Sequence, residues 1–277
     1  MSRIVFTDLD GTVLDRETYS WEAARPALAW LKDQAVPWVM VTSKTRAEVQ
    51  HWRRVLGNVH PFVVENGGAI FVPRSYFNRT IPGAIRRSDY EVIELGKPYA
   101  DLVRGLVAAS RASGCRVRAF HEMTAREVSA ACQLPLDLAV LAKRREYDEP
   151  FEIIDTERAD GLEAAIHAQG LLCIRGDRFH HVCGRHDKGA AAQLLAGLFC
   201  EFYGQQTVTI GLGDSQNDAA LLRTVDVPVI VRSRHVRALL QCVPNAFVTD
   251  CEGPEGWNEA VLDILRNQES LRIATEV

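Results

Sequence analysis

Two acids directly after a short apolar run constrain the fold of this chain more than any other feature. Residues 4–15 read IVFTDLDGTVLD, so Asp8 and Asp10 follow the run 4–6 almost at once. Such a run is typical of a buried strand. Burial of one unpaired carboxylate costs roughly several kcal/mol even after relaxation. Either a cation lies at the end of this strand, or one of the two acids carries a proton.

Strand and helix patterns alternate in the first part of the chain. Apolar, β-rich runs at 3–7, 37–42 and 61–73 are separated by helical patterns at 22–34 and 44–57. This β-α-β-α-β order predicts a parallel sheet whose strands are connected by helices.

A segment of another type interrupts the alternation, and the α/β pattern returns after it. We expect an α/β fold in which residues 1–84 and 185–277 form a Rossmann-like parallel-sheet core. The segment between them, 85–184, mixes strand and helix patterns without regular alternation and is expected to form an inserted α+β cap domain.

The composition excludes several classes of protein. The chain has 277 residues, 47% of them hydrophobic, and a net charge of −4, which gives no electrostatic case for a nucleic-acid or membrane partner. No apolar run reaches the ~18 residues that span a bilayer, and no signal-peptide pattern is found, so a cytoplasmic location is expected. The seven cysteines include no CxxC pair, which argues against a zinc site or a disulfide framework. The oligomeric state is not readable from the sequence.

A second predicted strand also ends in acids. The segment 211–218, GLGDSQND, places Asp214 and Asp218 after an apolar run. In an open parallel sheet, ligands bind beyond the carboxyl ends of the strands. If the two strands are neighbours, Asp8, Asp10 and Asp214 converge, and their mutual repulsion requires a cation. Mg²⁺ fits such oxygen ligands when phosphate is also present. For Asp218 alone, a helix N-cap is an equal alternative.

Two further residues are candidates for holding a phosphate. Thr42 ends the strand predicted at 37–42, and its hydroxyl and the following N–H groups could bind phosphate oxygens, although a plain helix cap would look the same. Lys188 stands at the start of a predicted helix, where the dipole favours anions. A lysine there makes sense beside a bound anion, and otherwise it would be solvated.

Together these residues predict phosphoryl transfer to a carboxylate. Asp8 is placed to act as a nucleophile toward phosphorus. Asp10 could protonate the leaving oxygen and then deprotonate water. Mg²⁺ would remove the charge barrier between carboxylate and phosphate, while Thr42 and Lys188 would hold the phosphoryl oxygens.

The motifs DLDGT and GDSQND, with Thr42 and Lys188 between them, resemble in type and order those of the haloacid dehalogenase superfamily of phosphotransferases. The inserted segment is similar to the larger α/β cap of sugar phosphatases in that superfamily. The resemblance implies that Asp8 forms an aspartyl-phosphate and that Asp10 is the acid and base.

The same resemblance implies the metal site. Asp8, the backbone oxygen of Asp10, and Asp214 would bind Mg²⁺. Asn217 and Asp218 would lie behind these ligands, where Asp218 supports the metal shell or Lys188.

A narrower resemblance covers segments from one end of the chain to the other and points to the mannosyl-3-phosphoglycerate phosphatase family. The matching segments are VTSKT (41–45), VENGGAIFVP (64–73), REYDEPF (145–151), GDRFHHV (176–182), DKG (187–189) and GPEGW (253–257). The family converts mannosyl-3-phosphoglycerate to mannosylglycerate, a compatible solute, so the implied partner is a small phosphorylated sugar acid.

The carboxylate of such a substrate requires basic residues to bind it. Arg178 suits a carboxylate because it can bind it bidentately, and Ser43 and Lys44 are expected on the phosphoglycerate side. As alternatives to substrate binding, Arg178 could form an ion pair at the surface and Lys44 could be solvated. One departure concerns the substrate: Asp177 and His180 stand where the family usually has a glycine and an aromatic residue.

Other functions stay open on the same scaffold. The substrate could be glucosyl-3-phosphoglycerate or another sugar phosphate, and a mutase is not excluded because fold does not fix function. A phosphate-accepting signalling module is disfavoured, because such modules lack both the second acid and the large cap.

Overall fold

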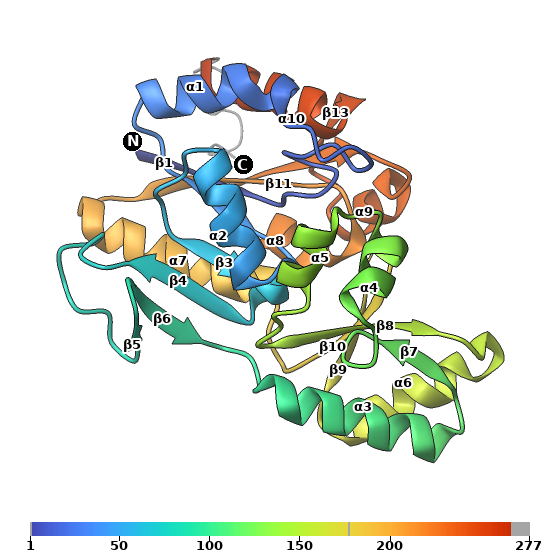
Figure 1. Cartoon of the computed structure of the whole chain (residues 1–277). Helices are drawn as coiled ribbons and strands as arrows, with labels where there is room; N and C mark the ends of the chain where they lie inside the picture. Colours follow the sequence, from blue (N-terminus) through green and yellow to red (C-terminus); the bar gives the residue numbers. More distant parts are fainter. Residues whose placement is uncertain (1, 177, 267–277) are drawn as a thin grey trace.

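In the larger of two β-sheets, three strands end directly before Asp8, Thr42 and Asp214. The computed structural model of the chain describes residues 2–176 and 178–266 (Figure 1). The strands of this sheet are β1 (Ser2–Thr7), β2 (Trp38–Val41), β3 (Phe62–Val64), β4 (Ala69–Pro73), β5 (Ile85–Arg87), β6 (Tyr90–Glu94), β11 (Thr207–Gly213), β12 (Val227–Arg232) and β13 (Phe247–Glu252). They lie in the order β13-β12-β11-β1-β2-β3-β4-β6-β5.

Parallel pairing brings the ends of β1, β2 and β11 to one edge of this sheet. Thr7 pairs with Leu212 of β11 on one side and with Met40 of β2 on the other. β3 continues the parallel arrangement, and β4, β6 and β5 then run antiparallel. The loops that follow β1, β2 and β11 therefore lie next to one another.

Helices cover both faces of the nine-stranded sheet (Figure 1). They are α1 (Arg25–Asp33), α2 (Arg46–Val55), α7 (Lys188–Tyr203), α8 (Ala219–Thr224), α9 (Val236–Cys242) and α10 (Gly253–Arg266). Val5 packs into the apolar cluster that includes Trp257 of α10, whereas Phe6 packs into the cluster that includes Phe199 of α7. Successive residues of β1 thus face opposite layers, as expected of a strand buried on both sides.

Two helix starts fix the positions of functional residues. The Thr45 hydroxyl accepts the N–H of Glu48, and the Glu48 carboxylate accepts the N–H of Thr45, so a capping box starts α2 directly after the β2 loop. The Asp187 side chain accepts the N–H of Ala190 at the start of α7, which makes Lys188 the first residue of that helix.

The smaller sheet and its helices come from the middle of the chain. The strands β7 (Val117–Ala119), β8 (Asp148–Ile153), β9 (Leu172–Arg175) and β10 (His180–Cys183) lie in the order β7-β8-β10-β9 and pair antiparallel. The helices here are α3 (Tyr99–Ser113), α4 (Ala125–Cys132), α5 (Leu136–Ala142) and α6 (Ala159–Ala168). We call this unit the cap. The predicted fold class, a parallel-sheet core with an inserted α+β unit, is confirmed.

The chain leaves the larger sheet later than expected. The sequence placed the start of the insert at residue 85, but β5 and β6 pair with each other, and β6 pairs with β4 along its whole length. The change of sheet therefore follows Glu94. Residues 1, 177 and 267–277, which the expected domain ranges include, lie outside the described residues.

Within the described residues, no helix combines the length and apolar character needed to cross a membrane. The cytoplasmic location stays a prediction.

Candidate active site

Three carboxylates meet at the edge where β1 and β11 end. Asp8 follows β1, and its N–H donates to the carbonyl oxygen of Leu212 at 3.0 Å, which ties it to β11. Asp8, Asp214 and Asp218 each offer a carboxylate oxygen within 4.8 Å of the others, and all three are buried. Parallel neighbouring strands thus bring acids together that lie some two hundred positions apart in the sequence.

Lys188 lies between two of these acids. Its ammonium donates to Oδ1 of Asp8 and to Oδ1 of Asp218, both at 2.7 Å, and its side chain has no solvent exposure. Burial raises the pKa of Asp8 to about 7; the Lys188 ammonium opposes this shift and the Asp218 carboxylate adds to it. Burial and the carboxylates of Asp218 and Asp8 likewise raise the pKa of Asp214 well above its ordinary value. The three carboxylates therefore carry more negative charge than the nearby Lys188 and Arg16 neutralise.

This donor set fits a hard divalent cation. Asp214 accepts the Thr12 hydroxyl at 3.2 Å and forms an ion pair with Arg16, which leaves carboxylate lone pairs on Asp8 and Asp214 for a metal. Asp218 is already occupied: Oδ1 accepts from Lys188, and Oδ2 accepts the N–H groups of Asp214 and Ser215 at 3.1 and 2.9 Å. Its engagement suits the supporting role expected for it.

Asp10 belongs to a separate ion pair. Its Oδ2 lies 2.8 Å from the ammonium of Lys44, which also lies 3.6 Å from Oε1 of Glu48. The other carboxylate oxygen, Oδ1, is buried and has no hydrogen-bond partner within the described part of the chain. Burial alone would lower the pKa of Lys44, but the carboxylates of Asp10 and Glu48 outweigh it and hold that pKa above its usual value. Lys44 thus fixes one oxygen of Asp10 and leaves the other for chemistry.

The loop after β2 is held from two sides. The buried Thr42 hydroxyl accepts the N–H of Lys44 at 3.2 Å, and the Thr42 carbonyl accepts the N–H of Asn66 at 3.0 Å. The Ser43 carbonyl accepts a hydrogen bond from Arg145 of the cap at 3.1 Å. The loop is therefore ordered by contacts with both the core and the cap.

A cavity of about 140 Å³ between core and cap connects most of the predicted residues. Its lining includes Asp8, Asp10, Ser43, Lys44, Arg178, Asp214 and Asn217. Thr42, Lys188 and Asp218 are buried beside it. Arg178 is exposed at this cavity, and its guanidinium donates to the carbonyl oxygens of Cys132 and, at 3.1 Å, Arg16. Asp177 lies outside the described residues.

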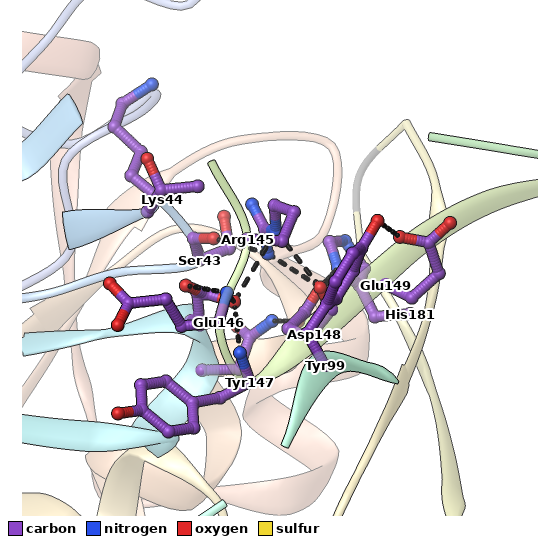
Figure 2. A network of polar contacts seen from close by, with 12 residues as sticks. Ser43, Lys44, Tyr99, Arg145, Glu146, Tyr147, Asp148, Glu149 and His181 are labelled. Atoms are coloured by element: carbon purple, nitrogen blue, oxygen red, sulfur yellow. Dashed lines mark hydrogen bonds and ion pairs between the residues drawn. The ribbon is translucent and has the colours of Figure 1, made fainter. Parts of the chain in front are cut away.

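The cap is fastened to the core by buried charges (Figure 2). Arg145 donates to Oδ1 of Asp148 at 2.6 Å, and its Nε lies 3.6 Å from a carboxylate oxygen of Glu65 in the core. The Glu65 carboxylate also accepts the N–H groups of Glu146 and Tyr147 at 3.0 and 2.7 Å. Burial raises the pKa of Glu65 to about 8, against the opposing charge of Arg145.

Several site residues were missed at the sequence level. Glu48 could have been found, because it is the third helical residue after Thr45 in a capping-box pattern, one turn from Lys44. Arg145 was part of the matching segment REYDEPF, and in the structure it pairs with Asp148 and Glu65. Arg16 and Asp148 carry no local pattern that singles them out.

Comparison with known proteins agrees with this geometry. A family model described as haloacid dehalogenase-like hydrolase matches residues 5–91. The chain is 39% identical over 271 residues to the glucosyl-3-phosphoglycerate/mannosyl-3-phosphoglycerate phosphatase of Methanococcoides burtonii, covering 96% of this chain and 98% of the relative. It is 34% identical over 239 residues to the mannosyl-3-phosphoglycerate phosphatase of Pyrococcus furiosus, covering 86% and 95%.

Solved structures share the fold at lower sequence identity. Protein 0175 of Thermoplasma acidophilum superposes with a TM-score of 0.67 at 18% identity, covering 96% of this chain and 99% of that one. The phosphatase BT1666 of Bacteroides thetaiotaomicron gives 0.66 at 20% identity, covering 96% of each chain.

Proposed function

Because the chain belongs to the mannosyl-3-phosphoglycerate phosphatase family of haloacid dehalogenase-like hydrolases, we propose that it hydrolyses mannosyl-3-phosphoglycerate to mannosylglycerate and phosphate. Because it belongs to this family, the chain is a phosphoric monoester hydrolase. The observation that carries the proposed chemistry is the contact of Lys188 with Asp8 at the edge where Asp214 and Asp218 also lie.

In the first step, the Asp8 carboxylate attacks phosphorus. Its Oδ1 is held by Lys188, so Oδ2 forms the new bond while the ester P–O bond breaks. Asp10 gives a proton to the departing alcohol oxygen from the carboxylate oxygen that Lys44 does not hold. The products of this step are the free alcohol and an aspartyl-phosphate on Asp8.

In the second step, water attacks phosphorus. Asp10 removes a proton from the water, the bond between Asp8 and phosphorus breaks, and inorganic phosphate leaves. Lys188, held against Asp8, and the loop that carries Thr42 are proposed to balance the charge on the phosphoryl oxygens through both steps. Asp8 and Asp10 thus return to their starting protonation states.

We propose that Asp8, Asp214 and the backbone oxygen of Asp10 hold Mg²⁺. When bound, this ion supplies charge neutralisation between the carboxylates and the incoming phosphate. The raised pKa values of Asp8 and Asp214 support the assignment, because a cation would offset both the burial and the repulsion between carboxylates that raise them.

The cap is proposed to close the site during phosphoryl transfer and to bind the sugar acid through Ser43, Lys44 and Arg178 at the cavity. We propose that the core comprises residues 1–94 and 185–277 and the cap residues 95–184, because β6 still pairs with β4 of the larger sheet. The sheet pairing supports the later boundary.

The glucosyl analogue is a second candidate substrate. The relatives with 39% and 38% identity, from Methanococcoides burtonii and Persephonella marina, carry names with both sugars, whereas the one from Pyrococcus furiosus, at 34%, is named for mannose alone. We therefore propose that this chain accepts either hexose on the glycerate.

Phosphate release in the presence of Mg²⁺ tests the proposal. The substrates are mannosyl-3-phosphoglycerate, glucosyl-3-phosphoglycerate, 3-phosphoglycerate and several hexose phosphates, with Asp8→Asn as the blank. We expect the highest kcat/KM for the two glycosyl-phosphoglycerates. A preference for plain hexose phosphates would refute the substrate while keeping the reaction class.

A further inference from the structure

Arg16 contacts Asp214, one of the acids proposed to hold the metal. The guanidinium forms an ion pair with Oδ2 of Asp214, whose side chain is 1% exposed, whereas the side chain of Arg16 is 31% exposed. The Asp214 carboxylate therefore has a cationic partner from the protein in addition to the metal that is proposed to bind it. Two cations, the guanidinium and the metal, share one carboxylate.

A glycine in the DLDGT motif gives this ion pair its space. Gly11 has φ +74°, a left-handed conformation that glycine adopts without strain. A Cβ added at this position would lie 2.9 Å from a guanidinium nitrogen of Arg16 and 2.8 Å from Oδ2 of Asp214. A larger residue would have to displace one of the two groups. The loop after β1 is thus shaped so that Arg16 reaches Asp214.

Other contacts hold Asp214 in place without Arg16. The Asp214 Oδ1 accepts the Thr12 hydroxyl at 3.2 Å, and the carbonyl oxygen accepts the Ser233 hydroxyl at 2.5 Å. The N–H of Asp214 donates to Oδ2 of Asp218 at 3.1 Å. The side chain and the backbone are thus each fixed by neighbours, and Arg16 is not needed to orient this carboxylate.

The contribution of Arg16 is positive charge. Burial and the carboxylates of Asp218 and Asp8 raise the pKa of Asp214, and the charges of Arg16 and Lys188 oppose this shift. Lys188 is shared between Asp8 and Asp218. Within the described residues, the cation in contact with Asp214 is therefore Arg16. A guanidinium on this carboxylate repels a second cation that binds the same group.

Arg16 also lies where a phosphate group can reach it. It lines the active-site cavity together with Asp8 and Asp214. It also lines a second cavity of about 370 Å³, whose walls include Arg178 and Arg232, so the guanidinium has space to move away from the carboxylate. The phosphate of the substrate has to lie against Asp8 for the proposed attack, and guanidinium groups bind phosphate through strong, often paired hydrogen bonds.

We propose that Arg16 competes with Mg²⁺ for Asp214, and that the phosphate of the substrate relieves this competition by binding the guanidinium. The inference rests on the proposed function, because it takes Asp214 as a ligand of Mg²⁺. Arg16 thus lowers the affinity of the free enzyme for Mg²⁺, and this restraint is lifted when phosphate is bound. Metal and phosphate then each tighten the binding of the other by the same factor.

Calorimetric titration of Mg²⁺ into wild type and Arg16→Gln, at the same pH, tests the competition. We expect the Kd for Mg²⁺ to fall roughly tenfold in Arg16→Gln, because a positive charge next to the metal is lost. The same loss favours protonation of Asp214, but a divalent ion gains more from it than a proton does. Arg16→Ala should give the same tighter binding, which shows that the new amide of Arg16→Gln is not itself a ligand.

Two further variants serve as controls. Arg16→Lys keeps the charge with a different shape, and its Kd for Mg²⁺ should stay within about threefold of wild type. Arg232→Gln removes the same charge from the second cavity, where Arg232 is exposed and its Nε donates to the Thr249 carbonyl at 3.0 Å. Because this charge does not contact Asp214 and is screened by solvent, the Kd should change less than about twofold.

Inorganic phosphate, a product of the proposed reaction, tests the second half of the proposal. Saturating phosphate should tighten Mg²⁺ binding in both proteins, because a cation attracts phosphate in either one. The tightening should be at least about threefold larger in wild type than in Arg16→Gln, since only wild type has a competing guanidinium to remove. An equal factor in both proteins would overturn the relief of the competition by phosphate.

The outcomes separate this inference from the proposed function. A Kd for Mg²⁺ that is unchanged or higher in both Arg16→Gln and Arg16→Ala would overturn the competition and leave the proposed metal site in place. If wild type binds no Mg²⁺ at all, the proposed metal site itself is refuted, and the inference falls with it. Tighter binding in both variants, with Arg16→Lys and Arg232→Gln close to wild type, is the result that supports it.

Discussion

The Lys44 ammonium lies 2.8 Å from Oδ2 of Asp10, in a buried position where it also faces Glu48. The sequence suggested Lys44 as a substrate-binding residue. In the structure its charge is shared between two carboxylates, and the ring of Tyr19 lies 5.2 Å from it. Lys44 is therefore placed to orient Asp10, the proposed acid and base, and it also lines the cavity where the sugar acid is proposed to bind.

Replacing Lys44 by Met should lower kcat roughly tenfold or more, because Asp10 loses the contact that aims its free oxygen. Lys44→Arg should restore part of the loss, since it keeps the charge with a different shape. Steady-state kinetics with saturating substrate checks this. If KM rises in Lys44→Met while kcat is unchanged, Lys44 serves binding and not the orientation of Asp10.

Asp8→Asn should abolish turnover and yet make the metal-free protein more stable at neutral pH. The pKa of Asp8 is raised from 3.8 to about 7, so the folded state binds more protons than the unfolded state in that window, and stability falls as pH rises through it. Asparagine removes this penalty. In EDTA, the Tm of the variant should exceed that of wild type by several degrees above pH ~7 and approach it below pH ~4. A lower Tm of the variant at all pH values would contradict a raised pKa of the buried Asp8 carboxyl.

Removal of divalent metal with EDTA should abolish phosphate release, and Mg²⁺ should restore it. The metal binds ionised carboxylates, while burial raises the pKa of Asp8 to about 7 and that of Asp214 well above its ordinary value. Protons therefore compete with Mg²⁺ for these carboxylates. As the pH falls below about 7, the apparent Kd for Mg²⁺ should rise by up to about tenfold per pH unit for each carboxylate that takes up a proton. The Mg²⁺-dependent rise in Tm, followed across pH, measures this. An affinity that does not change with pH would place the metal away from these acids.

The sequence predicted the catalytic edge because its residues follow parallel strands. Asp8 and Asp214 each come after a buried apolar run, and the carboxyl ends of such runs meet at one edge of a sheet. No detail of side-chain packing was needed for this step. The fold class could be predicted for the same reason.

The cap side of the site depends on information that the sequence does not display. Asp148 meets His181 only because β8 and β10 pair antiparallel in a register that puts His181 opposite Pro150. A shift of one residue would turn the side chain to the other face. The three-residue strands β5 and β7 are likewise too short for a periodic pattern.

The buried charges that join cap and core allow a last prediction, which concerns stability. Arg145 is 4% exposed in its side chain and faces the fully buried carboxylates of Glu65 and Asp148. Arg145→Met should lower the free energy of unfolding by about 3–5 kcal/mol, because the buried, ionised Asp148 loses the guanidinium that donates to it. Arg118 is the control: it pairs with Glu152 in the same cap but is 48% exposed. Arg118→Met should change stability by less than about 1 kcal/mol. Urea denaturation of both variants measures the difference, and similar small losses would mean that Arg145 does not fasten the cap.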